Sequence, residues 1–270
     1  MSETLFHPDG RVDVEELPNG KRRLHVIHRQ RGTAVPYNGW VTSYPVSLIR
    51  AVLAVKGPGY LCDEIRRDEG PSLFDKVLLG HFSERDFAGK RILDFGCGSG
   101  GSTVQLARVF PHSQIVGVEL VQEFVELARV RASHYGFPHV VFLTSPSETE
   151  LPADLGMVDF VAMCAVYEHL LPEERPKVLA MLWSHMKPGS VLFLTDTPHR
   201  YSPIESHTTH LPFLNYLPAG LALWVARKFA RGVAPDESWR ALLRRGVRGV
   251  VASGKSWEFC GDAERVNRKF

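Results

Sequence analysis

The chain of 270 residues has few cysteines, and none of them lie close together in the sequence. Its four cysteines are too far apart for a CxxC pair or a zinc-finger spacing, which argues against a disulfide framework and against a structural zinc site. No segment has the roughly 20 consecutive apolar residues of a membrane span. The first residues also lack an apolar run, so we expect no signal peptide and a cytoplasmic protein.

An excess of charge of one sign is absent as well. The chain has 32 basic and 30 acidic residues, a balance that does not indicate a nucleic-acid partner for the whole chain. We therefore expect no DNA partner, and RNA is not the favoured one. Hydrophobic residues make up 44% and charged residues 23% of the sequence, which excludes a disordered or fibrous chain. The sequence leaves the oligomeric state open.

The N-terminal part is expected to form a hairpin followed by helices. Apolar and polar residues alternate over residues 11–30 on both sides of Pro18-Asn19-Gly20, and Asn-Gly is typical of a β-hairpin turn. Residues 45–56 have the apolar spacing of a helix, which we expect to end at Gly57-Pro58-Gly59. A short helix is also expected around Leu73–Phe82.

From residue 91 onward, strands and helices alternate. The expected strands are 91–95, 114–119, 140–143, 158–164 and 191–195, and the expected helices are 102–110, 121–135 and 173–186. This alternation predicts an α/β fold, a Rossmann-like doubly wound, mainly parallel sheet with helices on both faces. The expected domains are an N-terminal hairpin and helical cap (1–87), a cofactor-binding core (88–198), a loop and lid helix after the fifth strand (199–246) and a C-terminal edge segment (247–270).

A glycine-rich loop, Asp94-Phe-Gly-Cys-Gly-Ser-Gly-Gly101, follows the first core strand and opens a helix. Its glycines allow a tight turn and a close approach of the backbone to a ligand. They also fit the dinucleotide fingerprint GxGxxG, so an NAD(P)-dependent oxidoreductase is one alternative. Asp94 favours a ligand that carries an ammonium group, because a carboxylate at this place would repel a pyrophosphate.

Together with Glu119, which ends the next strand, this loop resembles the class I S-adenosylmethionine-dependent methyltransferases over about residues 88–198. Their first motif is an acidic residue followed by GxGxG, and their second is an acidic residue after the second strand. The resemblance implies S-adenosylmethionine as cofactor and S-adenosylhomocysteine as product. It implies that Glu119 binds the ribose hydroxyls and that Leu120 packs against adenine. Where the family often has Asp-Ala after the third strand, this chain has Ser145-Pro146-Ser147-Glu148, so a serine is expected there instead.

The cofactor-binding residues expected on this basis are Asp94, Gly96, Cys97, Gly98, Gly100, Glu119, Leu120, Ser145, Ser147 and Cys164.

The segment after the fourth strand, Ala165-Val-Tyr-Glu-His169, resembles the small-molecule branch of the family, which includes the ubiquinone-pathway O-methyltransferases. Methyl transfer to a hydroxyl needs a group that takes up the proton, and histidine suits this role near neutral pH. The histidines of this segment and of the segment after the fifth strand are His169, His199, His207 and His210. We expect His169 and His207 to be catalytic, with Glu168 beside them.

The expected reaction is the transfer of a methyl group to a hydroxyl of a small or lipid-like molecule. Carbon methylation of a small molecule and 2′-O-methylation of RNA are alternatives within the class. Some members with Glu-x-x-Glu-His at this place bind a divalent ion, but here Ala165 holds the position of the first glutamate. A metal is therefore not favoured, although Glu205 or His207 would be able to complete a mixed site.

The stretch from Ser206 to Ala226 contains no charged Asp, Glu, Lys or Arg, and Leu221, Trp224, Val225 and Phe229 form a helical stripe. Residues 227–248 then hold seven Arg and Lys against two Asp and Glu. We expect a lid helix whose stripe packs on its own domain, with peripheral membrane contact through residues 217–248 as the alternative. Residues 247–252 and 256–260 are candidate edge strands; alternatively, residues 11–30 cover that edge.

Overall fold

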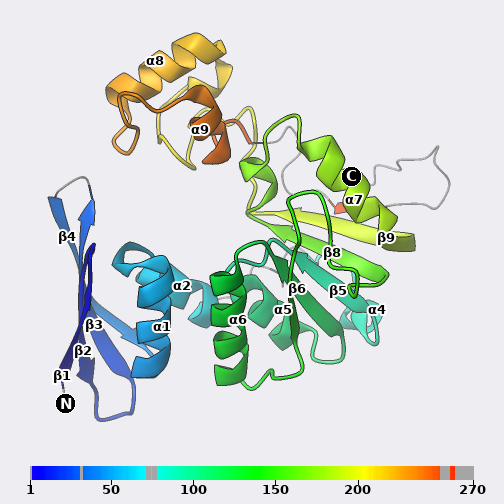
Figure 1. Ribbon diagram of the computed structural model, residues 1–270, viewed down its shortest axis with the longest axis horizontal. Helices are drawn as coiled ribbons and strands as arrows, with labels where there is room; N and C mark the ends of the chain where they lie inside the picture. The colour runs from blue at the N-terminus through cyan, green and yellow to red at the C-terminus, as the bar shows by residue number, and fades with distance from the viewer. Residues whose placement is uncertain (1, 31–32, 71–73, 75–77, 250–255, 259–270) are drawn as a thin grey trace.

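The computed structural model describes residues 2–30, 33–70, 74, 78–249 and 256–258. Figure 1 shows a central sheet with its helices, an N-terminal sheet to one side of it, and a helical lid that stands above both.

The N-terminal part is a four-stranded antiparallel sheet in the order β1-β2-β3-β4. Its strands are β1 (Ser2–His7), β2 (Gly10–Glu16), β3 (Arg22–Gln30) and β4 (Thr33–Thr42). The expected hairpin is confirmed as β2 and β3, with Val12 opposite Val26 and Val14 opposite Leu24. These four valine and leucine side chains are buried. They face α1 and α2, because the alternation of the strands puts these residues on the same side of the sheet.

Helix α1 (Val46–Lys56) confirms the predicted helix. Gly57, with φ +77°, ends it, but the chain begins a second helix at once, α2 (Pro58–Glu69). The predicted end of this helix at Gly57-Pro58-Gly59 is therefore confirmed. The second helix was not predicted, although proline is a favoured first residue of a helix. Most of the helix expected around Leu73–Phe82 lies outside the described residues, and α4 (Glu84–Phe87) follows it.

The core sheet has the order β10-β9-β8-β5-β6-β7, in which β10 is antiparallel and its neighbours are parallel. Its strands are β5 (Arg91–Phe95), β6 (Gln114–Glu119), β7 (Val141–Thr144), β8 (Val158–Cys164), β9 (Met186–Thr195) and β10 (Ser256–Glu258). Its helices are α5 (Gly101–Val109), α6 (Gln122–His134) and α7 (Arg175–Ser184). The predicted α/β fold class is confirmed.

The fifth strand differs from expectation, whereas the candidate edge strand at 256–260 is confirmed by β10. The fifth strand begins at Met186, so Pro188 and Gly189 lie inside β9 and do not end the preceding helix. The sheet edge beside β9 is occupied by β10, with Trp257 opposite Leu192. The alternative in which residues 11–30 cover this edge is wrong, because those residues pair within their own sheet.

Both faces of the core sheet are covered by helices. Ile92 and Leu93 are neighbours in β5 and point to opposite faces. On the side of Ile92 lie α5 and α6, and on the side of Leu93 lies α7 with Val178 and Leu182. Each of these buried aliphatic side chains stabilises the fold by roughly 1.5–3 kcal/mol.

The lid comprises a 3₁₀ turn η2 (Leu214–Tyr216), helix α8 (Ala219–Phe229) and helix α9 (Trp239–Arg244). It has a small core of its own that includes Leu214, Ala222, Ala226 and Leu242. The expected helix is present as α8. The expectation that its stripe packs inward holds only for Val225, which packs against this small core, and is wrong for the other three residues. Leu221, Trp224 and Phe229 are exposed, and the alanines are buried instead. Among the described residues, no helix is long and apolar enough to cross a membrane.

A buried ion cluster joins the N-terminal part to the core. Arg131 of α6 is fully buried and lies 2.6 Å from Glu64 and 3.2 Å from Asp68, both on α2. The Ser99 hydroxyl of the glycine-rich loop donates to Glu64 at 2.5 Å, and Tyr44 donates to Asp68. Removal of a buried charge from water costs several kcal/mol, so this cluster is stable only when all partners are in place.

We expect Arg131→Met to lower the free energy of unfolding by about 3–5 kcal/mol, because it leaves Glu64 and Asp68 buried without their counter-charge. Urea denaturation followed by circular dichroism measures this change. Arg66→Met removes an exposed ion pair with Asp63 on the same helix and should change stability by about 0.5 kcal/mol or less. Equal losses in the two variants would show that the buried cluster does not stabilise the docking.

Candidate active site

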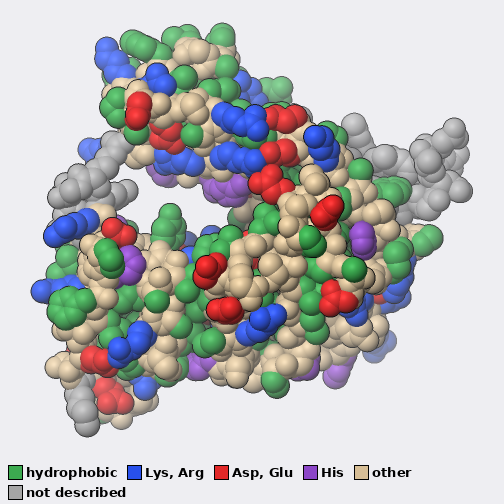
Figure 2. Space-filling model, viewed as in Figure 1, with side chains coloured by type: hydrophobic (Ala, Val, Ile, Leu, Met, Phe, Trp, Pro, Cys, Tyr) green, Lys and Arg blue, Asp and Glu red, His purple; other side chains and the backbone are tan. Residues whose placement is uncertain are grey.

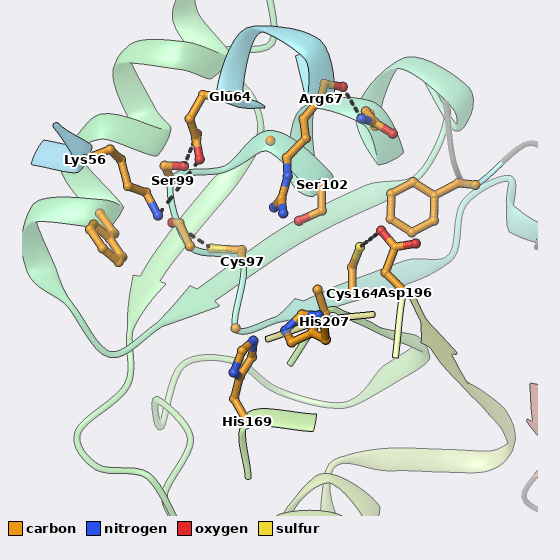
Figure 3. A pocket seen from close by; sticks show the side chains of 17 residues that line it. Lys56, Glu64, Arg67, Cys97, Ser99, Ser102, Cys164, His169, Asp196 and His207 are labelled. Carbon is orange, nitrogen blue, oxygen red and sulfur yellow. Dashed lines mark hydrogen bonds and ion pairs between the residues drawn. The ribbon is translucent and has the colours of Figure 1, made fainter. Parts of the chain in front are cut away.

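A cavity of about 390 Å³ lies at the carboxyl ends of β5, β8 and β9. This is the end of a parallel sheet where α/β folds bind ligands, and the volume falls within the range of small-molecule sites, about 300–1,000 Å³. Its walls come from helices α1 and α2, the glycine-rich loop with α5, the ends of β8 and β9, and the lid. Phe74, and Phe124 of α6, also line it. Figure 3 shows these groups around one space.

The glycine-rich loop forms the floor of this cavity with backbone in place of side chains. Gly96 has φ +69°, and a Cβ there would lie 2.8 Å from the side chain of Val166. Gly100 has φ +85° and precedes the first residue of α5. The amide of Gly98 donates to the Glu119 carboxylate at 2.9 Å, so the two motifs predicted from the sequence are in direct contact.

Asp94 precedes this loop and contacts the first turn of α5. It is 1% exposed and accepts hydrogen bonds from the hydroxyls of Ser102 (2.7 Å) and Thr103 (2.6 Å) in the first turn of α5. Its Oδ1 has no hydrogen-bond partner among the described residues. Burial raises the pKa of Asp94 to about 6, against the two hydroxyl hydrogen bonds, which lower it. Asp94 does not line the cavity, and its role in cofactor binding stays a prediction.

The other predicted cofactor residues divide into two groups. Gly96, Cys97, Gly98 and Cys164 line the cavity. Gly100, Glu119, Leu120, Ser145 and Ser147 do not. Glu119 also accepts from the Leu120 amide at 2.7 Å, and the Ser145 hydroxyl donates to the carbonyl of Glu150. The roles of this second group in cofactor binding stay predictions.

Sequence analysis missed four charged groups on the cavity wall, of which Asp196 follows β9 and the other three belong to the N-terminal helices. Lys56 ends α1, while Glu64 and Arg67 lie on α2. The Lys56 ammonium lies 4.0 Å from Glu64 and 4.0 Å above the ring of Phe124, and burial lowers its pKa. In Figure 3 Arg67 points from α2 into the cavity toward Ser102. Recognition of Pro58 as a helix start would have indicated an additional helix here.

The two expected histidines meet at the cavity wall opposite Arg67 (Figure 3). His169 comes from the 3₁₀ turn η1 (Tyr167–His169) after β8, and His207 comes from the lid; their ring centroids are 5.2 Å apart. Nδ1 of His169 lies 2.8 Å from the carbonyl of Arg244 in the lid. Burial, and then the nearby His169, lower the pKa of His207, which favours its neutral form. His199 and His210 do not line the cavity.

Glu168 lies beneath this histidine pair and is fully buried. Its Oε2 accepts from the hydroxyl of Thr197 at 3.0 Å, while Oε1 has no hydrogen-bond partner among the described residues and lies 4.0 Å from Nε2 of His169. Burial raises the pKa of Glu168. The ligand-type atoms of Glu168, His169 and His207 all lie within 4.8 Å of one another, a spacing that also suits a metal ion.

Glu205, an expected candidate to complete a metal site, has another function. It is buried and accepts hydrogen bonds from the amides of His207 (3.0 Å), Thr208 and Thr209. Its carboxylate therefore fixes the turn that carries His207 and has few lone pairs left for an ion.

Backbone strain occurs at the ends of the two strands that border the cavity. Ala165 after β8 has φ +54° and Asp196 after β9 has φ +56°, and both line the cavity. Non-glycine residues with positive φ cost about 1–3 kcal/mol each and cluster at functional sites.

Comparisons with known proteins identify the family of the chain. A methyltransferase domain model matches residues 92–189. The ubiquinone biosynthesis O-methyltransferase of Xanthomonas euvesicatoria is 30% identical over 196 residues, which cover 67% of this chain and 73% of that protein. The trans-aconitate 2-methyltransferase of Deinococcus radiodurans is 31% identical over 109 residues, which cover 40% of this chain and 38% of that protein.

Coverage is lower for other relatives. The chain spans 42%, 38% and 52% of the length of the first three curated relatives. A solved structure of an amino pentose methyltransferase from Micromonospora echinaspora is 26% identical, with a TM-score of 0.38, and covers 47% of this chain and 52% of that one. The identity and coverage of the Xanthomonas relative, together with the matched methyltransferase domain, show that the chain belongs to the class I S-adenosylmethionine-dependent methyltransferases.

Proposed function

We propose that the protein transfers a methyl group from S-adenosylmethionine to a hydroxyl of a small or lipid-like acceptor. The observation that carries this proposal is the pair His169 and His207, one from the core and one from the lid, on the wall of the cofactor cavity. The Xanthomonas relative is by name an O-methyltransferase of ubiquinone biosynthesis, which supports the same chemistry. Because the chain belongs to the methyltransferase family, we no longer consider the NAD(P)-dependent oxidoreductase that the glycine pattern also allowed.

The residues around the cavity fit the cofactor. Loop backbone at Gly96 and Gly98 leaves room for the methionine part, and the uncompensated charge of Asp94 below favours its ammonium group. Arg67 has no ion-pair partner among the described residues and suits the methionine carboxylate. When bound, the cofactor supplies an electrophilic methyl group on a sulfonium.

His207 is the proposed base. Its lowered pKa keeps the imidazole neutral near neutral pH, and Glu205 holds the turn from which it projects. The imidazole of His207 would take up the proton of the acceptor hydroxyl while that oxygen is methylated. His169 shapes the same wall and contacts the lid through the carbonyl of Arg244.

A divalent ion is the second candidate for activation of the acceptor, favoured by the unpartnered Oε1 of Glu168. Glu168, His169 and His207 would be its ligands, and the ion would lower the pKa of a bound hydroxyl.

Carbon methylation and RNA 2′-O-methylation are the remaining alternatives for the acceptor. One curated relative, from Shewanella halifaxensis, is named as a methyltransferase of carbon 5 of a 23S rRNA uracil.

The proposed acceptor class is tested with methyl-labelled S-adenosylmethionine and a cell extract that is then separated into organic-soluble, water-soluble and acid-precipitable fractions. We expect label in one of the two small-molecule fractions. Label confined to the precipitate would contradict the proposal, because the acceptor would then be RNA or protein.

Asp94→Asn should weaken S-adenosylhomocysteine binding at least about ten-fold, because the loop loses its negative charge and a hydrogen-bond acceptor for Ser102 or Thr103. In the wild type, Asp94 loses its charge as the pH falls through about 6, so affinity should fall over that range. Isothermal titration calorimetry measures both effects. Asp159→Asn, at the opposite end of the sheet beside Lys187, is the matched control and should bind normally. A pH profile for Asp94→Asn identical to that of wild type would remove Asp94 from the explanation.

His207→Ala should lower kcat by about 10²–10⁴-fold, the usual contribution of a general base. Its affinity for S-adenosylhomocysteine should stay close to that of wild type, because only the acceptor proton is concerned. The exposed His199 of the same segment does not line the cavity, so His199→Ala should keep full activity. Equal activity of wild type and His207→Ala would exclude His207 as the base.

Removal of divalent ions separates the two modes of activation. With His207 as a free base, dialysis against EDTA leaves kcat unchanged, and titration with Mn²⁺ produces no binding heat. Loss of activity with EDTA, restored by Mn²⁺ or Mg²⁺, would instead assign Glu168, His169 and His207 as ligands. In that case Glu168→Gln should weaken Mn²⁺ binding measured by calorimetry.

A further inference from the structure

Helix α8 carries its large apolar side chains on the outside of the molecule. Ala222, Ala226 and Ala230 recur every four residues and are buried. Leu221, Trp224 and Lys228 follow at spacings of three and four residues and lie on the opposite side of the helix. Leu221 is 47% and Trp224 53% exposed. A helix that only closed its own domain would be expected to have the reverse arrangement.

The exposed apolar surface extends beyond α8. Phe229 is 57% exposed and its ring lies edge-on to Trp224, with centroids 6.1 Å apart. Phe213 and Tyr216, in the turn before α8, are also exposed, and their rings are 6.3 Å apart. We call these five side chains the outer lid face: Phe213, Tyr216, Leu221, Trp224 and Phe229. In Figure 2 hydrophobic and basic side chains lie together over this upper part of the molecule.

Along the sequence, the segment that carries the outer lid face has charge of one sign. Asp236 and Glu237 follow it, and Nε of Arg227 donates to the carbonyl of Glu237 at 3.0 Å. Between Glu205 and Asp236 the sequence has no carboxylate and three cations, Arg227, Lys228 and Arg231. None of the three forms an ion pair with a carboxylate within the described parts of the chain. The Lys228 ammonium lies 5.0 Å from the ring centroid of Trp224 and 5.6 Å from that of Phe229, so the charge and the apolar surface are in contact.

We propose that the outer lid face rests on a membrane surface that contains anionic lipids. Tryptophan prefers the boundary between headgroups and acyl chains, and a lysine beside it keeps its ammonium at the level of the phosphates. Anionic headgroups match the three cations, which a neutral apolar partner would leave without counter-charge. This inference does not depend on the reaction proposed above, because the outer lid face lies outside the cavity wall.

The test is sedimentation of the full chain with sucrose-loaded vesicles, in the absence of cofactor and acceptor. We expect much stronger binding to phosphatidylcholine vesicles that contain phosphatidylglycerol than to phosphatidylcholine alone, and a loss of binding at high salt. The double variant Trp224→Ser, Phe229→Ser should bind at least about ten-fold more weakly, because two large side chains no longer insert. Lys228→Glu with Arg231→Glu should remove the preference for phosphatidylglycerol.

The matched control is Phe6→Ser, which removes a 79% exposed aromatic side chain from β1. It should bind vesicles as the wild type does, and every variant should keep its affinity for S-adenosylhomocysteine if the fold is intact. Equal binding of wild type to both kinds of vesicle, or an equal loss in Phe6→Ser, would overturn the proposal. A wild-type dimer in sedimentation velocity that becomes a monomer in Trp224→Ser, Phe229→Ser would also overturn it, because a second copy would then cover this face.

Discussion

The buried guanidinium of Arg131 determines how the N-terminal helices sit on the core. It contacts Glu64 and Asp68 of α2 while it belongs to α6, and Glu64 also receives the hydroxyl of Ser99 from the glycine-rich loop. A charge without exposure to water requires all of its partners. The docking of α2, the burial of Arg131 and the position of Ser99 therefore depend on one another. Gly101 belongs to the same arrangement, because a Cβ there would lie 3.1 Å from the guanidinium. This constraint holds α2 against the loop and so creates one wall of the cavity.

The cavity combines three parts of the chain that meet only in the folded molecule. The core contributes backbone and the buried charge of Asp94, the N-terminal helices contribute Lys56 and Arg67, and the lid contributes His207. The lid is attached near the site by contacts of His169 with the Arg244 carbonyl and of Arg244 with Glu174. Movement of the lid would therefore move His207 relative to His169. This dependence gives the structure a direct physical connection between lid position and the group proposed to take up the proton.

Most of the core was predictable from the sequence because its signals are local. Strand–helix alternation, the glycines and Glu119 lie within short segments, and β6 and β8 have the predicted ends. The cap was only partly predictable. Gly57-Pro58-Gly59 has two meanings, a stop or a restart, and only the packing of Leu61 and Ile65 decides between them. Because α2 was not predicted, nothing in the sequence indicated that Arg67 lies on the cavity wall. Glu205 was considered as a ligand because a carboxylate beside histidines suggests one, but its lone pairs are used by backbone amides, which no residue pattern reveals.

The stripe on α8 shows a more general limit. Hydrophobic periodicity identifies which residues share a face of a helix, but it does not say which face is turned inward. Here Leu214, Leu242 and Val247 fill the lid core beside α8, which meets them with its alanines and with the partly buried Leu223 and Val225. A turn of α8 that buried Trp224 would require a wider lid core than these residues provide. Packing therefore selects the alanine face, and the bulky face stays outside. The alanines on one side of α8 allow the lid core to pack closely, and the bulky residues on the other side form the apolar surface outside.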